Sequence, residues 1–114
     1  MTQHAGLTPE RWARFTHSQR VLMIANEMNR AGRLMGAGDA ESRRLAYERI
    51  LRLADLTIAV AERNAVRREL LRWRDLVASL YVESEARPDD HRVAFRALLQ
   101  QTPESALQIS ALGC

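Results

Sequence analysis

The chain contains no lysine, and its single cysteine is its last residue, Cys114. A phosphate-binding loop of the Walker type requires a lysine, so the sequence excludes that class of nucleotide-binding protein. One cysteine cannot form an intrachain disulfide or a zinc knuckle of paired cysteines. The end of the chain also offers no neighbouring base that would activate the thiol of Cys114, so we expect no nucleophilic catalysis from it.

Long apolar runs are also missing from the chain. No stretch approaches the roughly 18 consecutive apolar residues that a membrane-spanning helix needs. The first ten residues lack the basic and apolar regions that mark a signal peptide. These absences predict a cytoplasmic protein with no membrane-spanning segment.

Arginine alone carries the basic charge, and 17 arginines against 14 acidic residues give a net charge of +3. The pI of 10.0 overstates this excess, because without lysine few groups titrate between histidine and arginine. The arginines form no continuous stripe on any predicted helix and no basic tail. The composition therefore gives weak support for nucleic-acid binding, which stays an alternative function.

The length and composition predict one all-α domain. A chain of 114 residues falls in the range of about 100 to 200 residues that single domains occupy. Alanine, leucine, arginine and glutamate make up about half of the chain, a share typical of long helices. The β-branched residues that favour strands are few.

The first helix is predicted to begin at Thr8-Pro9-Glu10 and to end near Met35. Threonine caps the free amides of a helix start, proline suits the first helical position, and glutamate complements the helix dipole. Gly36 and Gly38 then stop the helix, and Asp39 is placed to open the next one. Residues spaced four and three apart form the apolar face, namely His17, Val21, Ile24, Met28, Ala31 and Met35.

The second predicted helix, which opens after Asp39, carries two adjacent apolar stripes that together cover about half of its circumference. Such a helix should have neighbours on two sides. The stripes are Ala46, Ile50, Leu53, Thr57 and Val60, and Tyr47, Leu51, Ala54, Ile58 and Ala61. The opposite side is acidic at every seventh residue and is predicted to face water or to form ion pairs with the following helix. Its carboxylates are Glu41, Glu48, Asp55 and Glu62, and the arginines of the following helix are Arg67 and Arg74.

The third predicted helix covers residues 65–82, and no glycine or proline separates it from the second. Leu70 follows Ile50 by twenty residues, so at 100° per residue its apolar face lies about 200° around the axis. Either the chain turns near Asn64, a residue type that tolerates the left-handed conformation of a helix end, or one rod of about 45 residues contacts different partners on opposite faces. We favour the turn. The apolar seam consists of Val66, Leu70, Trp73, Val77 and Leu80.

A shorter helix is predicted from Pro88 to about Gln101, because proline and two aspartates open it. Thr102-Pro103-Glu104 then repeats the helix-opening pattern of the N-terminus and starts a last short segment, which either docks or frays. The apolar side of the helix from Pro88 consists of Ala94, Phe95, Leu98 and Leu99.

The predicted domain organisation has three parts. Residues 1–7 form an N-terminal tail, residues 8–101 form the helical bundle, and residues 102–114 form a short helix or tail.

Candidate catalytic and metal-binding residues are few. No Glu-x-x-His pair of the kind used in di-metal bundles occurs, and carboxylates seven residues apart lie about 10.5 Å apart along a helix, too far to share one ion. His17 is the only histidine on a predicted apolar face, and we interpret it as structural and partly exposed near the bundle end. His4 and His91 are predicted at the surface. We therefore predict no catalytic, cofactor-binding or metal-binding residues, and we favour a protein that is not an enzyme.

The predicted fold is an antiparallel bundle of three principal helices plus one or two short C-terminal helices, completed by homodimerisation. The first helix would be about 42 Å long, whereas the fourth would have about half that length. Part of the second helix would therefore lack a cover within the chain, and a second copy would supply it.

Six residues are candidates for the interface with a second copy or another protein. Trp12 lies off the main seam of the first helix, and exposed aromatic residues often anchor contacts. Asn29 borders the apolar face, where a polar group can fix the register between helices. The second helix supplies the rest. The candidate interface is Trp12, Asn29, Ile50, Leu53, Ile58 and Val60.

The sequence favours a non-enzymatic protein that acts through self-association and protein-partner binding. Two alternatives stay open, a small helical protein associated with RNA or DNA, and a bundle that binds a small molecule or a metal between its helices.

Overall fold

The structure, a computed structural model, describes residues 7–62 and 64–109. Within these ranges it contains helices and no strand, which confirms the predicted all-α class. None of the described helices is both long enough and apolar enough to cross a membrane. The helices are α1 (Pro9–Trp12), α2 (His17–Gly32), α3 (Ala40–Val60), α4 (Ala65–Tyr81), α5 (Pro88–Leu99) and α6 (Pro103–Ala106).

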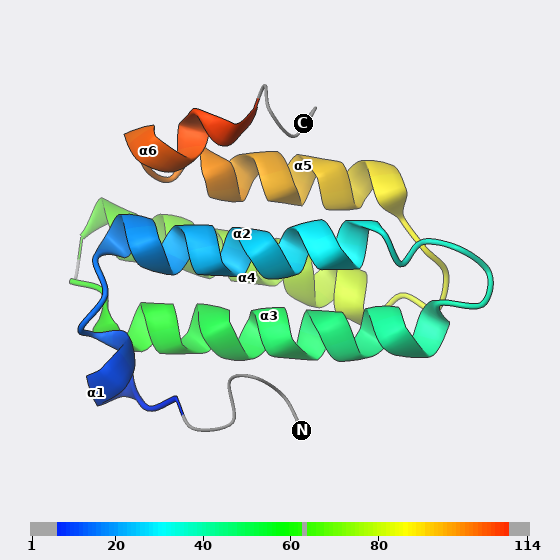
Figure 1. The fold of residues 1–114 in the computed structure, drawn as a ribbon, viewed down its shortest axis with the longest axis horizontal. Helices are drawn as coiled ribbons and strands as arrows, with labels where there is room; N and C mark the ends of the chain where they lie inside the picture. Colours follow the sequence, from blue (N-terminus) through cyan, green and yellow to red (C-terminus); the bar gives the residue numbers. More distant parts are fainter. Residues whose placement is uncertain (1–6, 63, 110–114) are drawn as a thin grey trace.

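Four of these helices run back and forth around one core (Figure 1). Contacts connect α2 to α3, α3 to α4, α4 to α5, and α5 back to α2, so the four helices close a ring. The short α1 packs against α3, and the short α6 packs against α2. The helix from Pro88 is therefore a full member of the bundle.

The core lies inside this ring and is built from the predicted apolar faces. Burying one large aliphatic side chain stabilises a fold by about 1.5–3 kcal/mol. Val66, the first residue of the predicted seam of α4, is an exception, because it is 38% exposed. The fully buried aliphatic residues include Val21, Ile24 and Met28 of α2, Ile50 and Leu53 of α3, Leu70 and Val77 of α4, and Leu98 and Leu99 of α5.

The predicted continuous helix from Thr8 to near Met35 is wrong, because the chain breaks between α1 and α2. Thr16 is the N-cap of α2, and its hydroxyl accepts a hydrogen bond from the Gln19 amide at 3.1 Å. The Gln19 side chain accepts one from the Thr16 amide at 2.8 Å. This reciprocal capping box satisfies two free amides and stabilises a new helix start at this point.

The break allows Trp12 to fold into the core. Its side chain is 0% exposed, and its indole N–H donates a hydrogen bond to the Thr57 hydroxyl at 2.8 Å. The Thr57 hydroxyl donates in turn to the Leu53 carbonyl at 2.8 Å. The guanidinium of Arg20 donates to the carbonyl of Phe15, just beyond the end of α1. A continuous helix would have held Trp12 on its outer face, which is why the sequence predicted an exposed residue there.

The predicted turn between the second and third helices is confirmed. Helix α3 ends at Val60, and α4 begins at Ala65. Asn64 is the N-cap of α4, and its side chain accepts a hydrogen bond from the Val66 amide at 2.9 Å. Its φ of −170° is extended, so the left-handed conformation suggested for it is wrong. Asparagine serves here as a cap acceptor, and the turn brings the apolar face of α4 back onto the same core.

The predicted lack of cover on α3 is not observed at Ile50 and Leu53, which are both 0% exposed. Helix α2 has 16 residues and α3 has 21. At 1.5 Å per residue, α2 is about 24 Å long and α3 about 32 Å. Because α1 folds back against α3, Trp12 covers α3 around Thr57.

The described part of the C-terminal segment docks against the bundle. Thr102 caps α6 by accepting a hydrogen bond from the Ser105 amide at 3.0 Å. The buried Ser105 hydroxyl donates to the Leu99 carbonyl at 2.6 Å. Residues 1–6 of the predicted tail, and 110–114 with Cys114, lie outside the described residues.

The hydrogen bond between Trp12 and Thr57 gives a direct test of the α1 contact. Thr57→Val should lower the free energy of unfolding by about 1–3 kcal/mol, because it leaves the indole N–H buried without an acceptor. Thr57→Ser keeps the hydroxyl and serves as the control. Urea unfolding of both variants measures the difference, and a Thr57→Val protein as stable as Thr57→Ser would contradict the assignment.

Candidate functional site

The predicted interface residues mostly lie inside the protein's own core. Trp12, Ile50, Leu53 and Ile58 are buried, and only Asn29 and Val60 are partly exposed. A second chain could not reach the four buried side chains without opening the bundle. The apolar stripes of α3 therefore make contacts within the chain, and a site on the folded surface would lie elsewhere.

His91, predicted at the surface, is buried at the meeting point of three helices. Its Nε2 lies 2.9 Å from the Met28 carbonyl of α2, and its Nδ1 lies 2.8 Å from the Tyr47 hydroxyl of α3. A carbonyl only accepts hydrogen bonds, so Nε2 carries the proton and Nδ1 accepts from Tyr47. The sequence contained a signal for this burial, because His91 precedes Phe95 by four residues on the apolar side of α5.

Burial sets the ionisation of this histidine–tyrosine pair. Desolvation lowers the pKa of His91 below its ordinary value of 6.5, which favours the neutral ring. Desolvation also raises the pKa of Tyr47 to about 12. Both groups are neutral near pH 7 and have their hydrogen bonds satisfied inside the core. This geometry holds α5 against α2 and α3, and it leaves neither ring nitrogen of His91 open to a ligand.

Glu27 is a second buried polar residue, and its burial was not predicted from the sequence. Its side chain is 2% exposed, and its Oε1 lies 3.3 Å from Nε of Arg49 and 3.6 Å from Nη1 of Arg30. A buried carboxylate needs such partners to offset its loss of hydration. Its pairing with Arg49 connects α2 to α3, so we interpret Glu27 as structural.

His17 is partly exposed at the end of the bundle, where the sequence predicted it. With Arg20 it lines a cavity of about 280 Å³ beside the last residues of α3 and the start of α4. Burial, and secondarily the charge of Arg20, lower the pKa of His17. Among the described residues, no group of three or more histidine, cysteine, aspartate or glutamate side chains could hold a metal ion.

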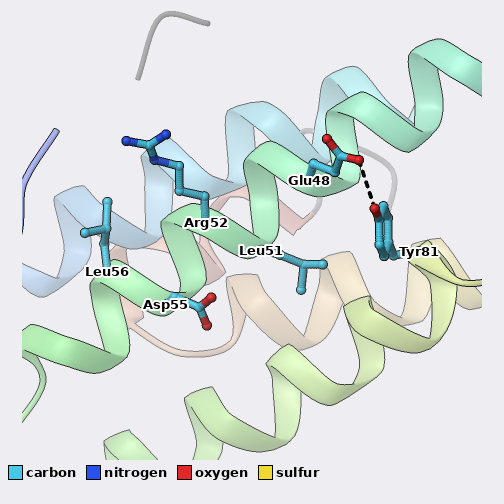
Figure 2. Close-up of a pocket in the computed structure, with 6 residues that line it drawn as sticks. All are labelled: Glu48, Leu51, Arg52, Asp55, Leu56 and Tyr81. Carbon is cyan, nitrogen blue, oxygen red and sulfur yellow. Dashed lines mark hydrogen bonds between the residues drawn. The ribbon is translucent and has the colours of Figure 1, made fainter. Parts of the chain in front are cut away.

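An open groove of about 480 Å³ lies between α3 and α4 and is the candidate functional site (Figure 2). Leu51 points into the space between the two helices, whereas Arg52 extends away from α4. Leu51 and Leu56 are half-buried and supply apolar surface next to charged groups. The groove is lined by Glu48, Leu51, Arg52, Asp55, Leu56 and Tyr81.

Polar contacts connect α3 and α4 at two points along this groove. The Tyr81 hydroxyl donates to Oε2 of Glu48 at 2.8 Å, and Arg44 pairs with the same carboxylate oxygen. Further along, the guanidinium of Arg74 donates to both carboxylate oxygens of Asp55. The bond to Asp55 raises the pKa of Arg74. This part of the predicted acidic face therefore combines the two expected roles, because Asp55 is exposed to water and also forms the predicted ion pair with Arg74.

Arg52 differs from these neighbours. It is exposed and makes no hydrogen bond or ion pair with the described part of the chain. It lies on α3 between Glu48 and Asp55, both of which have partners. The groove thus has apolar walls, two carboxylates that are already paired, and at its outer edge one guanidinium without a partner among the described residues.

Comparison of the chain with models of protein families, with curated proteins and with solved structures gives no match.

The buried His91 predicts that stability depends on pH. The unfolded chain binds a proton at His91 more readily than the folded chain, because the folded pKa is lowered. The contribution of neutral His91 to the free energy of unfolding is therefore complete above the unfolded pKa of about 6.5. It is lost as the pH falls toward the lower pKa of the folded chain. Urea unfolding at about pH 7.5 and about pH 5 should show this loss in the native chain and a smaller loss in His91→Gln.

His17→Gln is the matched control for this experiment. The pKa of His17 is also lowered, so this variant removes the contribution of His17 and keeps that of His91. An unchanged pH dependence in His91→Gln would show that the buried ring does not cause the effect.

Proposed function

We propose that this chain is a non-enzymatic cytoplasmic protein that acts through self-association into a homodimer, and through binding of protein partners, at the groove between α3 and α4. The observation that carries the proposal is that Arg52, which has no partner among the residues that the structure describes, lies beside half-buried Leu51 and Leu56. Protein interfaces combine a small apolar centre with a polar rim, and arginine is enriched in them. The groove offers both on the outer face of two adjacent helices.

Exposed leucines on the same two helices extend the apolar surface. Leu45 of α3 is 42% exposed, and Leu71 of α4 is 45% exposed. Single exposed leucines are ordinary, but two of them on the helices that line the groove enlarge the area that a partner helix would cover. Helix-in-groove recognition uses apolar anchors at this kind of helical spacing.

The charges around the groove favour a protein surface over a nucleic-acid backbone. Nucleic-acid binding needs a patch of one sign, free to contact phosphates. Here Arg44 is paired with Glu41 and Glu48, and Arg74 is paired with Asp55. The two signs alternate along α3, as they do at interfaces where charges set the specificity.

Light scattering tests the proposal directly. At micromolar concentration the native chain should have twice its mass of 13.0 kDa. Leu51→Gln, which places a polar group in the groove, should weaken the dimer by about tenfold or more, because it removes apolar area from the contact. Leu56→Gln should have the same effect.

Val93→Gln is the control for these two variants. Val93 is 64% exposed on α5 and does not line the groove, so its replacement should leave the mass unchanged. Circular dichroism verifies that each variant keeps its helical content. A native chain that stays monomeric across the concentration range would contradict self-association.

A further inference from the structure

The outward side of α3 carries a stripe of residues at the spacing that two paired helices use. Leu45, Glu48, Arg52, Asp55 and Ala59 follow one another at intervals of three and four residues. Each of them is exposed or half-exposed in the single chain. An alternation of three-residue and four-residue intervals keeps one seam of a helix facing a partner helix along its length.

We infer that this outer stripe pairs α3 with α3 of a second copy in antiparallel orientation, about a two-fold axis midway between Arg52 and Asp55. The inference rests on the proposed self-association and specifies its geometry. A two-fold axis uses the same surface on both copies, so every contact across it occurs twice. Each Arg52 then lies opposite the partner's Asp55.

The charges of the single chain suit this pairing. Arg52 has no partner among the described residues, and it is exposed on the outer side of α3. The side chain of Asp55 is 56% exposed while it holds Arg74. An ionised carboxylate can accept about four hydrogen bonds, so Asp55 has room for a second guanidinium. Arg52 of one copy thus meets a carboxylate of the other copy, Asp55, that can accept further hydrogen bonds.

The leucines of the groove have the same centre of symmetry as the charges. Leu51 and Leu56 are equally distant in sequence from the midpoint of Arg52 and Asp55, so Leu51 lies level with the partner's Leu56. The two leucines project on opposite sides of the outer stripe, because five residues correspond to about 140° around the helix. Each ion pair between chains is therefore bordered by one leucine from each copy, which reduces its contact with water.

Other registers match the surface less well. A parallel pairing in register places Arg52 opposite the partner's Arg52, and like charges in contact are unfavourable. An antiparallel pairing centred between Glu48 and Arg52 matches those two charges but places Leu51 level with the partner's Arg49. It also relies on Glu48, which already accepts hydrogen bonds from Arg44 and Tyr81.

Two charge-reversal variants test this geometry, alone and mixed. In an Arg52→Asp homodimer two carboxylates would meet at each contact, and in an Asp55→Arg homodimer two guanidinium groups would meet. Each variant alone should bind itself at least about 100-fold more weakly than the native chain, because like charges then meet at two places.

 When the two variants are mixed, the native Arg52 of the Asp55→Arg chain faces the native Asp55 of the Arg52→Asp chain, and the two introduced groups face each other. Both contacts therefore join opposite charges, so a heterodimer should form. Native mass spectrometry identifies it, since the two variants differ in mass.

Matched controls separate the pairing from a general change in charge. Arg68→Asp on α4 makes the same reversal at an exposed arginine outside the groove. Asp89→Arg on α5 loses one ion pair within the chain, with Arg92, as Asp55→Arg loses that with Arg74. Both controls should form homodimers like the native chain. Circular dichroism and thermal unfolding verify that all four variants are folded.

The outcomes distinguish this inference from the proposed function. Two monomeric variants that form a heterodimer when mixed support the antiparallel pairing. A native dimer in which either reversal has no effect, or a mixture that stays monomeric, would overturn the pairing and leave self-association standing. A native chain that is monomeric throughout would overturn both.

Discussion

The fold depends on one constraint, the wide apolar arc of α3. A helix that is apolar over half of its circumference needs cover on two sides, and here α2 with α1 lies on one side and α4 on the other. The apolar faces that remain on α2 and α4 are closed by α5, which completes the ring. Trp12 follows from the same need, because α2 is shorter than α3. The break at Thr16 also contributes to the burial of α3, because it allows α1 to fold back against that helix.

Much of this arrangement could be predicted from the sequence because it depends on periodicity. The stripes of α3, the seam of α4 and the turn near Asn64 follow from where apolar residues recur along a helix. The break at Thr16 depends on a competition between a continuous helix and a capped restart. The Thr16 and Gln19 pair was a readable signal for the restart. What decides the outcome is the contact between Trp12 and Thr57, which are 45 residues apart.

The candidate site was harder to predict, and the reason is physical. Periodicity shows which face of a helix is apolar, but the cover supplied by the rest of the chain depends on the packed fold. The apolar Ile50 and Leu53 therefore suggested an interface with another chain, but both side chains are already buried within the bundle. The outer side of α3 alternates in charge and resembles an ordinary solvated face. Only the packed structure separates the paired Asp55 from Arg52, which has no partner among the described residues.

The separate capping of α2 has a consequence for the motions of the folded protein. Helix α1 has four residues, too few to be helical in water by itself, so its order depends on its contacts with α3. Because Thr16 and Gln19 cap α2 without help from α1, the loss of α1 would leave the start of α2 intact. The N-terminal turn is thus a cooperative unit that can detach and re-form at a lower free energy than global unfolding. Each opening would uncover the C-terminal part of α3 around Thr57 while the four-helix ring stays closed.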